Sequence, residues 1–283
     1  MESRSVQIVT FNANEASAVN GFISQLVAAQ DSIWRFDGPF VALAQGTPKQ
    51  SIRHVPLSAQ GNTMAAGQVA RFFSDSKPQD FVIFYGCAGA INPANVGSAF
   101  LVKGSYYASL GTVEMKGGRE NVTLKNKWIV DTGTNQTPLD ALELPRASSD
   151  DSLNLPIRTG ISTAHVIATD KVVRVTPTIA PTPISTTLPH ARYAKAEWTY
   201  AQSLAYFASS HSGDLLVEME SFGICTIAHA LGIADQTLIL RIATDDLVNH
   251  ATSDKQQFDL LWAGRTALAR LVLAVLRPGV TLP

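Results

Sequence analysis

The sequence predicts an α/β protein whose sheet is covered by helices on both faces. Two observations lead to this class. Short runs of apolar and β-branched residues recur along the 283 residues, and segments with apolar residues at helical spacing separate them. Hydrophobic residues make up 46% of the chain and charged residues only 16%, so we expect a large buried core rather than disorder.

The chain up to residue 90 alternates predicted strands with predicted helices. Its most strand-like run, residues 81–85, leads directly into Gly86-Cys87-Ala88-Gly89-Ala90. The small residues of this segment indicate either a close approach of ligand and backbone or a tight turn. Asn62 or Thr63 is expected to cap the second helix. The predicted strands are 6–11, 40–44, 53–57 and 81–85, and the predicted helices are 15–28 and 62–74.

The rest of the chain continues this alternation and carries two atypical segments. Residues 116–154 are polar and rich in turn formers, and residues 174–190 contain four prolines. Both are interpreted as long excursions at the surface, with lids or binding loops as the alternative. Because no linker or repeat divides the chain, a single domain over residues 1–283 is expected. The predicted strands are 128–130, 215–217 and 236–244, with one or two further strands in 160–169. The predicted helices are 192–209, 221–231 and 253–276, the last capped by Ser253.

Charge and cysteine content exclude several classes of function. The formal net charge is -1, so the chain lacks the basic field that nucleic-acid polymers or anionic membranes require. The two cysteines, Cys87 and Cys225, are too few for a disulfide framework or a multi-cysteine zinc site. No cluster of His, Cys and Asp has metal-ligand spacing, so we expect no metal or cofactor. The sequence shows neither a leader nor an apolar run of membrane length, so we expect a cytoplasmic protein.

Acidic residues gather where predicted strands end. Glu218 and Glu220 lie between a buried strand and a buried helix, where carboxylates are costly unless they are paired or used, although acids also favour a helix N-terminus. Asp245 ends the strand that contains Arg241, and Glu15 follows the first strand. Because ligands of open α/β sheets bind at the carboxyl ends of strands, we expect these acids and the glycine-containing segment to converge in one cleft.

These motifs, in this order, resemble the nucleoside phosphorylase/nucleosidase superfamily, and especially its methylthioadenosine/S-adenosylhomocysteine nucleosidases. The resemblance rests on the strand leading into Gly86-Cys87-Ala88-Gly89-Ala90, on Val217-Glu218-Met219-Glu220-Ser221 before a helix, and on Arg241-Ile242-Ala243-Thr244-Asp245. Segments 61–66 and 167–173 add to it, so it covers nearly the whole chain. It implies a three-layer α/β/α sandwich around a central mixed β-sheet, a homo-oligomer (dimer or hexamer), and cleavage of an N-glycosidic bond in a purine nucleoside or nucleotide.

The resemblance also implies a role for each matching residue. Asp245 would protonate or hydrogen-bond the purine at N7, Glu15 would activate the attacking water with Arg241 nearby, and Glu220 would hold the ribose hydroxyls. Chemistry supports these roles, because a carboxyl group that protonates the departing base contributes roughly 10²–10⁴-fold and needs the raised pKa that an apolar pocket provides. The remaining substrate-binding positions are Met219, Cys87, Ala88, Gly89, Val172 and Val173.

The expected nucleophile is water. Phosphorylases of this superfamily carry a Gly-Asp-Pro phosphate loop followed by an arginine, and another arginine before the glycine-containing segment. Here the first loop reads Phe11-Asn12-Ala13-Asn14-Glu15 and the later position is Phe84 or Tyr85, so phosphate would meet an acid and lack a cationic clamp. A phosphate-dependent phosphorylase and a non-catalytic nucleoside-binding protein are the alternatives. Cations that would contact a 5′-phosphate if the excursions cover the site are Lys171, Arg174, Arg192 and Lys195.

Overall fold

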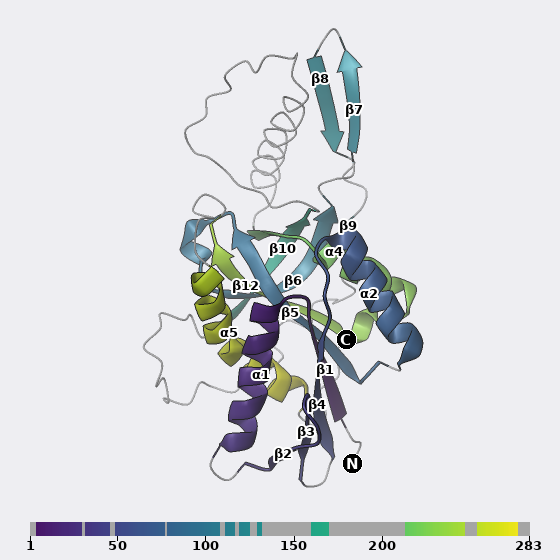
Figure 1. Ribbon diagram of the computed structural model, residues 1–283. Helices are drawn as coiled ribbons and strands as arrows, with labels where there is room; N and C mark the ends of the chain where they lie inside the picture. The colour runs from purple at the N-terminus through teal and green to yellow at the C-terminus, as the bar shows by residue number, and fades with distance from the viewer. Residues whose placement is uncertain are drawn as a thin grey trace.

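The computed structural model has a mixed α/β architecture around a central mixed sheet (Figure 1). It describes residues 4–29, 32–45, 49–76, 78–107, 111–116, 119–124, 129–131, 160–169, 213–246 and 254–276. Within these ranges a 10-stranded sheet has the order β11-β10-β6-β12-β5-β1-β4-β3-β2, and β9 pairs with β6. Its strands are β1 (Arg4–Thr10), β2 (Trp34–Phe36), β3 (Val41–Ala44), β4 (Gln50–Pro56), β5 (Phe81–Ala90), β6 (Ala99–Tyr107), β9 (Ile129–Asp131), β10 (Ile161–Ala168), β11 (Asp214–Glu218) and β12 (Thr237–Asp245).

Part of this sheet closes on itself through the long strand β5. The strand pairs in parallel with β1 and β12, and its last residues pair with β11 in antiparallel fashion, with Ala90 opposite Leu216 and Gly89 opposite Val217. Strands β5, β12, β6, β10 and β11 therefore form a closed ring. The ring brings the ends of β5, β11 and β12 together, although their segments are far apart in the sequence.

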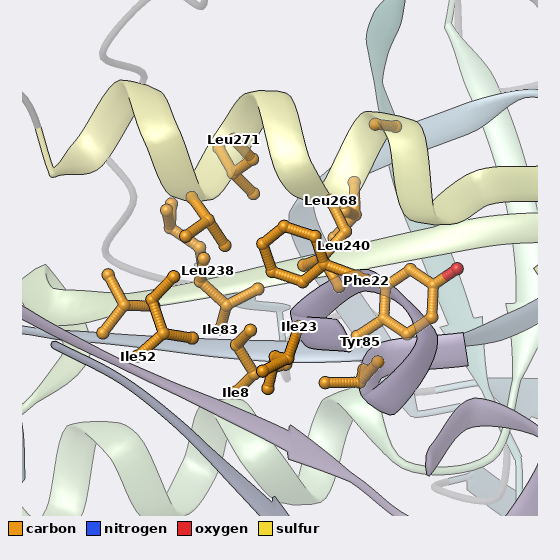
Figure 2. Close-up of a cluster of buried hydrophobic side chains, with 14 of the residues drawn as sticks. Ile8, Phe22, Ile23, Ile52, Ile83, Tyr85, Leu238, Leu240, Leu268 and Leu271 are labelled. Carbon is orange, nitrogen blue, oxygen red and sulfur yellow. The ribbon is translucent and has the colours of Figure 1, made fainter. Parts of the chain in front are cut away.

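Helices cover the two faces of the sheet. Helices α1 (Ala13–Ala28) and α5 (Asp254–Val275) pack against each other over the face that carries Ile8, Ile83 and Leu240 (Figure 2). Helices α2 (Asn62–Asp75) and α4 (Ser221–Ala230) pack together over the face that carries Val9 and Phe84. The prediction of an α/β fold with a central mixed sheet is thus confirmed. None of the described helices is long and apolar enough to cross a membrane.

Several predicted boundaries are wrong. The segment 86–90 is not a turn but the second half of β5, because hydrogen bonding to β12 and β11 outweighs the low strand propensity of its small residues. Helix α2 is capped by Gly61, whose φ is 89°, and not by Asn62 or Thr63. The excursion at 116–154 contains β8 (Arg119–Leu124) and β9, so this part is not only turns.

Four strands escaped prediction because their sequences lack a continuous apolar run. The largest is the central strand β6, whose apolar residues are interrupted by Lys103, Gly104 and Ser105. The others are β2, β7 (Gly111–Lys116) and β8, and the last two form a separate two-stranded sheet. The predicted helix 192–209, the excursion 174–190 and the cap at Ser253 lie outside the described residues. The other described elements match the prediction to within a few residues, and 160–169 holds one strand.

A buried histidine links β1, β4 and α1. His54 is 2% exposed, with its Nε2 atom 3.0 Å from the Thr10 hydroxyl and its Nδ1 atom 2.8 Å from Asn20 Oδ1. Because Asn20 Oδ1 can only accept, Nδ1 carries the proton and Nε2 accepts from Thr10. Burial lowers the pKa of His54 from 6.5 to about 4. The neutral ring is therefore part of the folded core.

This pKa makes the contribution of His54 to stability depend on pH. Between pH 6.5 and about 4 the unfolded state binds a proton that the folded state does not, so stability is lost as the pH falls through this window. We expect the difference in unfolding free energy between the wild type and His54→Gln to fall by about 3 kcal/mol from pH 7 to pH 4. Urea unfolding at several pH values measures it, and a difference that stays constant with pH would contradict the assignment.

Candidate functional site

A cavity of about 780 Å³ opens where β1, β5, β11 and β12 end, a size suited to a small organic ligand. It is formed by the loop from β1 into α1, the segment before α2, the second half of β5, the junction of β11 and α4, and the first turn of α5. Its lining residues are Phe11, Asn12, Ala13, Asn14, Glu15, Ser58, Ala59, Gln60, Met64, Cys87, Ala88, Gly89, Thr169, Val217, Glu218, Met219, Glu220, Asp245 and Gln257.

Glu15 lies in the first turn of α1 and reaches the cavity from there. Asn12 caps the helix and forms a capping box with Glu15, because the Asn12 side chain accepts from the Glu15 N–H while Glu15 Oε2 accepts from the Asn12 N–H. Oε2 also accepts from the N–H of Phe11 (2.9 Å), and Oε1 accepts from the N–H of Cys87 (3.2 Å). Burial raises the pKa of Glu15, and Arg241 opposes this shift. Glu15 is thus both a helix-start acid and a cavity acid.

A buried ion pair joins Glu218, which lines the cavity, to Arg241 behind it. Arg241 of β12 is 1% exposed, and its Nε and Nη2 atoms donate to Glu218 Oε2 at 3.2 and 2.8 Å. Nη2 also lies 3.9 Å from Glu220 Oε2. The guanidinium therefore neutralises part of the negative charge that Glu218 and Glu220 bring to this wall.

Glu220 is the N-cap residue of α4 and is partly buried. Desolvation raises its pKa to about 8, and the negative charge of Glu218 contributes to the rise. The charge of Arg241 and a hydrogen bond from the N–H of Gly61 act in the opposite direction, while Glu15 adds to the rise. A proton on Glu220 is therefore easily gained or lost near neutral pH.

Gly86 allows Arg241 and Glu15 to approach β5 closely. A Cβ atom at this position would lie 2.5 Å from Arg241 Nη1 and 2.8 Å from Glu15 Oε1. Both distances are shorter than real Cβ contacts, so any side chain here would displace the arginine or the carboxylate.

The Cys87 thiol connects Glu15 to helix α5. Its sulfur lies 3.6 Å from Glu15 Oε1 and 3.4 Å from Gln257 Nε2, and Gln257 Oε1 accepts from Asn14 Nδ2 at 3.2 Å. Burial, followed by the charges of Glu15 and Glu220, raises the pKa of Cys87 well above its usual value. The thiol is therefore protonated at neutral pH and serves as a donor to Glu15.

Asp245 is the last residue of β12 and lines the cavity at 8% exposure. The hydroxyl of Thr244 lies 3.4 Å from its Oδ2 atom. Among the described residues, no group of three or more His, Cys, Asp and Glu side chains is arranged to hold a metal ion.

Most of the residues expected at the site line this one cavity: Glu15, Cys87, Ala88, Gly89, Met219, Glu220 and Asp245. Arg241 lies behind the wall instead, and Val172 and Val173 lie outside the described residues. The sequence interpretation missed the parts played by Gly86 and Gln257. It also missed the Asn12 cap, which the spacing Asn-x-x-Glu could have indicated.

Comparison with solved structures shows that the fold is similar to that of methylthioadenosine/S-adenosylhomocysteine nucleosidases and of futalosine hydrolase, so the resemblance found in the sequence is confirmed at the level of the fold. No protein-family model matches the sequence, and no curated protein matches it.

Three solved structures illustrate the likeness. The S-adenosylhomocysteine nucleosidase of Streptococcus pyogenes, in complex with 5-methylthiotubericidin, is 17% identical with a TM-score of 0.56, and the match covers 99% of each chain. The 5′-methylthioadenosine/S-adenosylhomocysteine nucleosidase of Helicobacter pylori is 11% identical with a TM-score of 0.54, covering 98% of each chain. A futalosine hydrolase mutant of Helicobacter pylori is 12% identical with a TM-score of 0.53, covering 96% of this chain and 98% of the other. At such identities the likeness concerns the fold.

The close approach at Gly86 can be tested by alanine substitution. Gly86→Ala is expected to destabilise the protein by about 1–3 kcal/mol, because its Cβ would collide with Arg241 and Glu15. Gly67→Ala is the matched control, since nothing lies within 4 Å of a Cβ at this exposed position in α2, and it is expected to be neutral or slightly stabilising. Urea unfolding compares the two variants, and equal effects would contradict the steric argument.

Proposed function

We propose that the protein is an N-glycosidase that hydrolyses the bond between ribose and the purine of an adenine-type nucleoside or nucleotide. The observation that carries the proposal is the presence of Glu15, Glu220 and Asp245 on one cavity of suitable size. The nucleosidase fold of the neighbouring structures supports it.

In this proposal the three acids divide the work. Asp245 protonates or hydrogen-bonds N7 of the leaving purine, and Glu15 orients and deprotonates the attacking water. Glu220 binds the 2′- and 3′-hydroxyls, and in its ionised form it stabilises the positive charge that grows on the sugar as the bond breaks. Proton donation to the base is worth roughly 10²–10⁴-fold. The raised pKa of Glu15 suits a base, because a more basic carboxylate takes a proton from water more readily.

The other residues position the substrate or the acids. Arg241 acts through Glu218, Glu220 and Glu15, since it lies behind the cavity wall and is bound to Glu218. We assign Met219 and the Cys87-Ala88-Gly89 segment to the sugar side of the cavity, and Val172 and Val173 to the base.

Charge favours water over phosphate as the nucleophile. Among the described residues, the cavity lining holds four acids (Glu15, Glu218, Glu220 and Asp245) and neither lysine nor arginine. A phosphate dianion would be repelled by these carboxylates, whereas a neutral water molecule would donate hydrogen bonds to them without that cost.

We further propose that residues 1–283 form one domain, that its layers are those of a three-layer α/β/α sandwich, and that it acts in the cytoplasm as a homo-oligomer without a cofactor. Size-exclusion chromatography with light scattering tests the oligomeric state.

Removing the acid of Asp245 tests the proposed reaction. Asp245→Asn keeps the size of the side chain but removes the proton donor, so we expect the rate of adenine release to fall at least 10²-fold. Asp246→Asn is the matched control, because the same change one position along lies outside the cavity lining and should leave the rate within a few-fold of wild type.

The assay uses a panel of adenine nucleosides and nucleotides, with and without phosphate, and measures free base by chromatography. Release by Asp245→Asn at the wild-type rate would contradict the role of Asp245. Release that requires phosphate and yields ribose 1-phosphate would identify a phosphorylase, and binding without turnover would identify a nucleoside-binding protein.

A further inference from the structure

The Glu218 carboxylate accepts hydrogen bonds from the Arg241 guanidinium and from two backbone N–H groups. Glu218 is the last residue of β11, and its side chain is 2% exposed. Its Oε2 atom accepts from Arg241 Nε and Nη2, from the N–H of Glu220 (3.0 Å) and from the N–H of Ser221 (2.9 Å). Its Oε1 atom also accepts from the N–H of Ser221. One carboxylate thus ties the end of β11 to β12 and to the start of α4.

The same hydrogen bonds hold Met219 and Glu220, which line the cavity. Met219 and Glu220 follow Glu218 directly, and the Glu218 carboxylate accepts from the backbone N–H groups of Glu220 and Ser221. The carboxylate also fixes one side of the Arg241 guanidinium, whose Nη1 atom lies toward Gly86 beside Glu15. A shift of Glu218 would therefore move Glu220 and Arg241 together.

We propose that Glu218 is a positioning residue of the proposed nucleosidase site. Its carboxylate holds Arg241 and the first turn of α4 so that Met219 and Glu220 meet the ribose. Glu218 and Glu220 also approach the same Nη2 atom of Arg241, at 2.8 and 3.9 Å, so the charge of one acts on the other. This inference rests on the proposed function for the identity of the ligand, but not for the coupling between Glu218 and Glu220.

The charge environment of Glu220 comes from five elements. Among the described residues, Glu218 of β11 and Glu15 of α1 add negative charge, and Arg241 of β12 adds positive charge. The Gly61 N–H at the start of α2 donates a hydrogen bond to Glu220, and the Cys87 thiol of β5 interacts with its charge. After desolvation, Glu218 is the largest contributor to the raised pKa of Glu220. Removing its charge should therefore lower that pKa.

Two substitutions separate charge from geometry. Glu218→Gln keeps the size of the side chain and removes its charge. Glu218→Asp keeps the charge but withdraws the carboxylate by one methylene, so it cannot reach Arg241 and the Ser221 N–H at their present distances. A residue that only stabilised the start of α4 would leave the protonation of Glu220 unchanged in both variants.

The experiment titrates the side-chain carboxyl of Glu220 by carbon-13 NMR in full-length protein, with Glu220→Gln used to assign the signal. In wild type we expect an inflection near pH 8. In Glu218→Gln the inflection should move down by about one pH unit or more, because a neighbouring negative charge has been removed. In Glu218→Asp it should stay near the wild-type value, whereas kcat/KM for the best nucleoside of the panel should fall about tenfold or more.

Different results overturn different statements. An unchanged inflection in Glu218→Gln would overturn the control of Glu220 by charge, and wild-type kcat/KM in Glu218→Asp would overturn the positioning role. If Glu218→Gln does not fold, the aspartate variant alone decides the positioning role through its kcat/KM, with circular dichroism as the check on folding. If the wild type turns over no nucleoside, the proposed function fails, and the NMR titration still decides whether Glu218 controls Glu220.

Discussion

One buried cation in the middle of acidic side chains is the constraint on which the site depends. Arg241 lies within 4 Å of Glu218 and Glu220, and Glu15 lies beside its other amino group across Gly86. Three carboxylates this close would repel one another without the guanidinium, and the guanidinium would be a costly buried charge without them. Desolvation raises the pKa values of both Glu15 and Glu220. At Glu220 the negative charges of Glu218 and Glu15 add to the rise, because the single positive charge of Arg241 does not offset them. Shifted pKa values of this kind are typical of functional sites.

The fold creates this cluster by closing half of the sheet. Strand β5 pairs with β12 along its length and with β11 at its end, so the strands that carry Arg241 and Glu218 meet on either side of it. Gly86, in the middle of β5, leaves the space in which Arg241 and Glu15 approach. The start of α4 and the start of α1 then supply Glu220 and Glu15. The polar network extends through Cys87 to Gln257, so helix α5 is also connected to the cavity.

Much of this arrangement could be predicted from the sequence, because acids at the ends of buried strands are rare and strand ends in α/β sheets converge. That reasoning placed Glu15, Glu220 and Asp245 around one cleft, and they line one cavity, although their roles stay proposals. The course of residues 86–90 could not be predicted, since small residues suit a turn and pair as a strand only because β11 and β12 supply partners. The part played by Gln257 depends on how α5 packs against α1, which local sequence does not encode. Strand β6 was missed because Lys103 and Gly104 interrupt its apolar pattern, while burial between β10 and β12 decides its structure.

In the proposed reaction these carboxylates direct water to the anomeric carbon of a purine nucleoside. The most direct measurement is cleavage of adenine nucleosides in water enriched in oxygen-18, with the sugar reduced at once to prevent exchange and analysed by mass spectrometry. We expect free adenine together with a sugar that carries one labelled oxygen, whether or not phosphate is present. Adenine released without label in the sugar, or no release from any member of the panel, would contradict it.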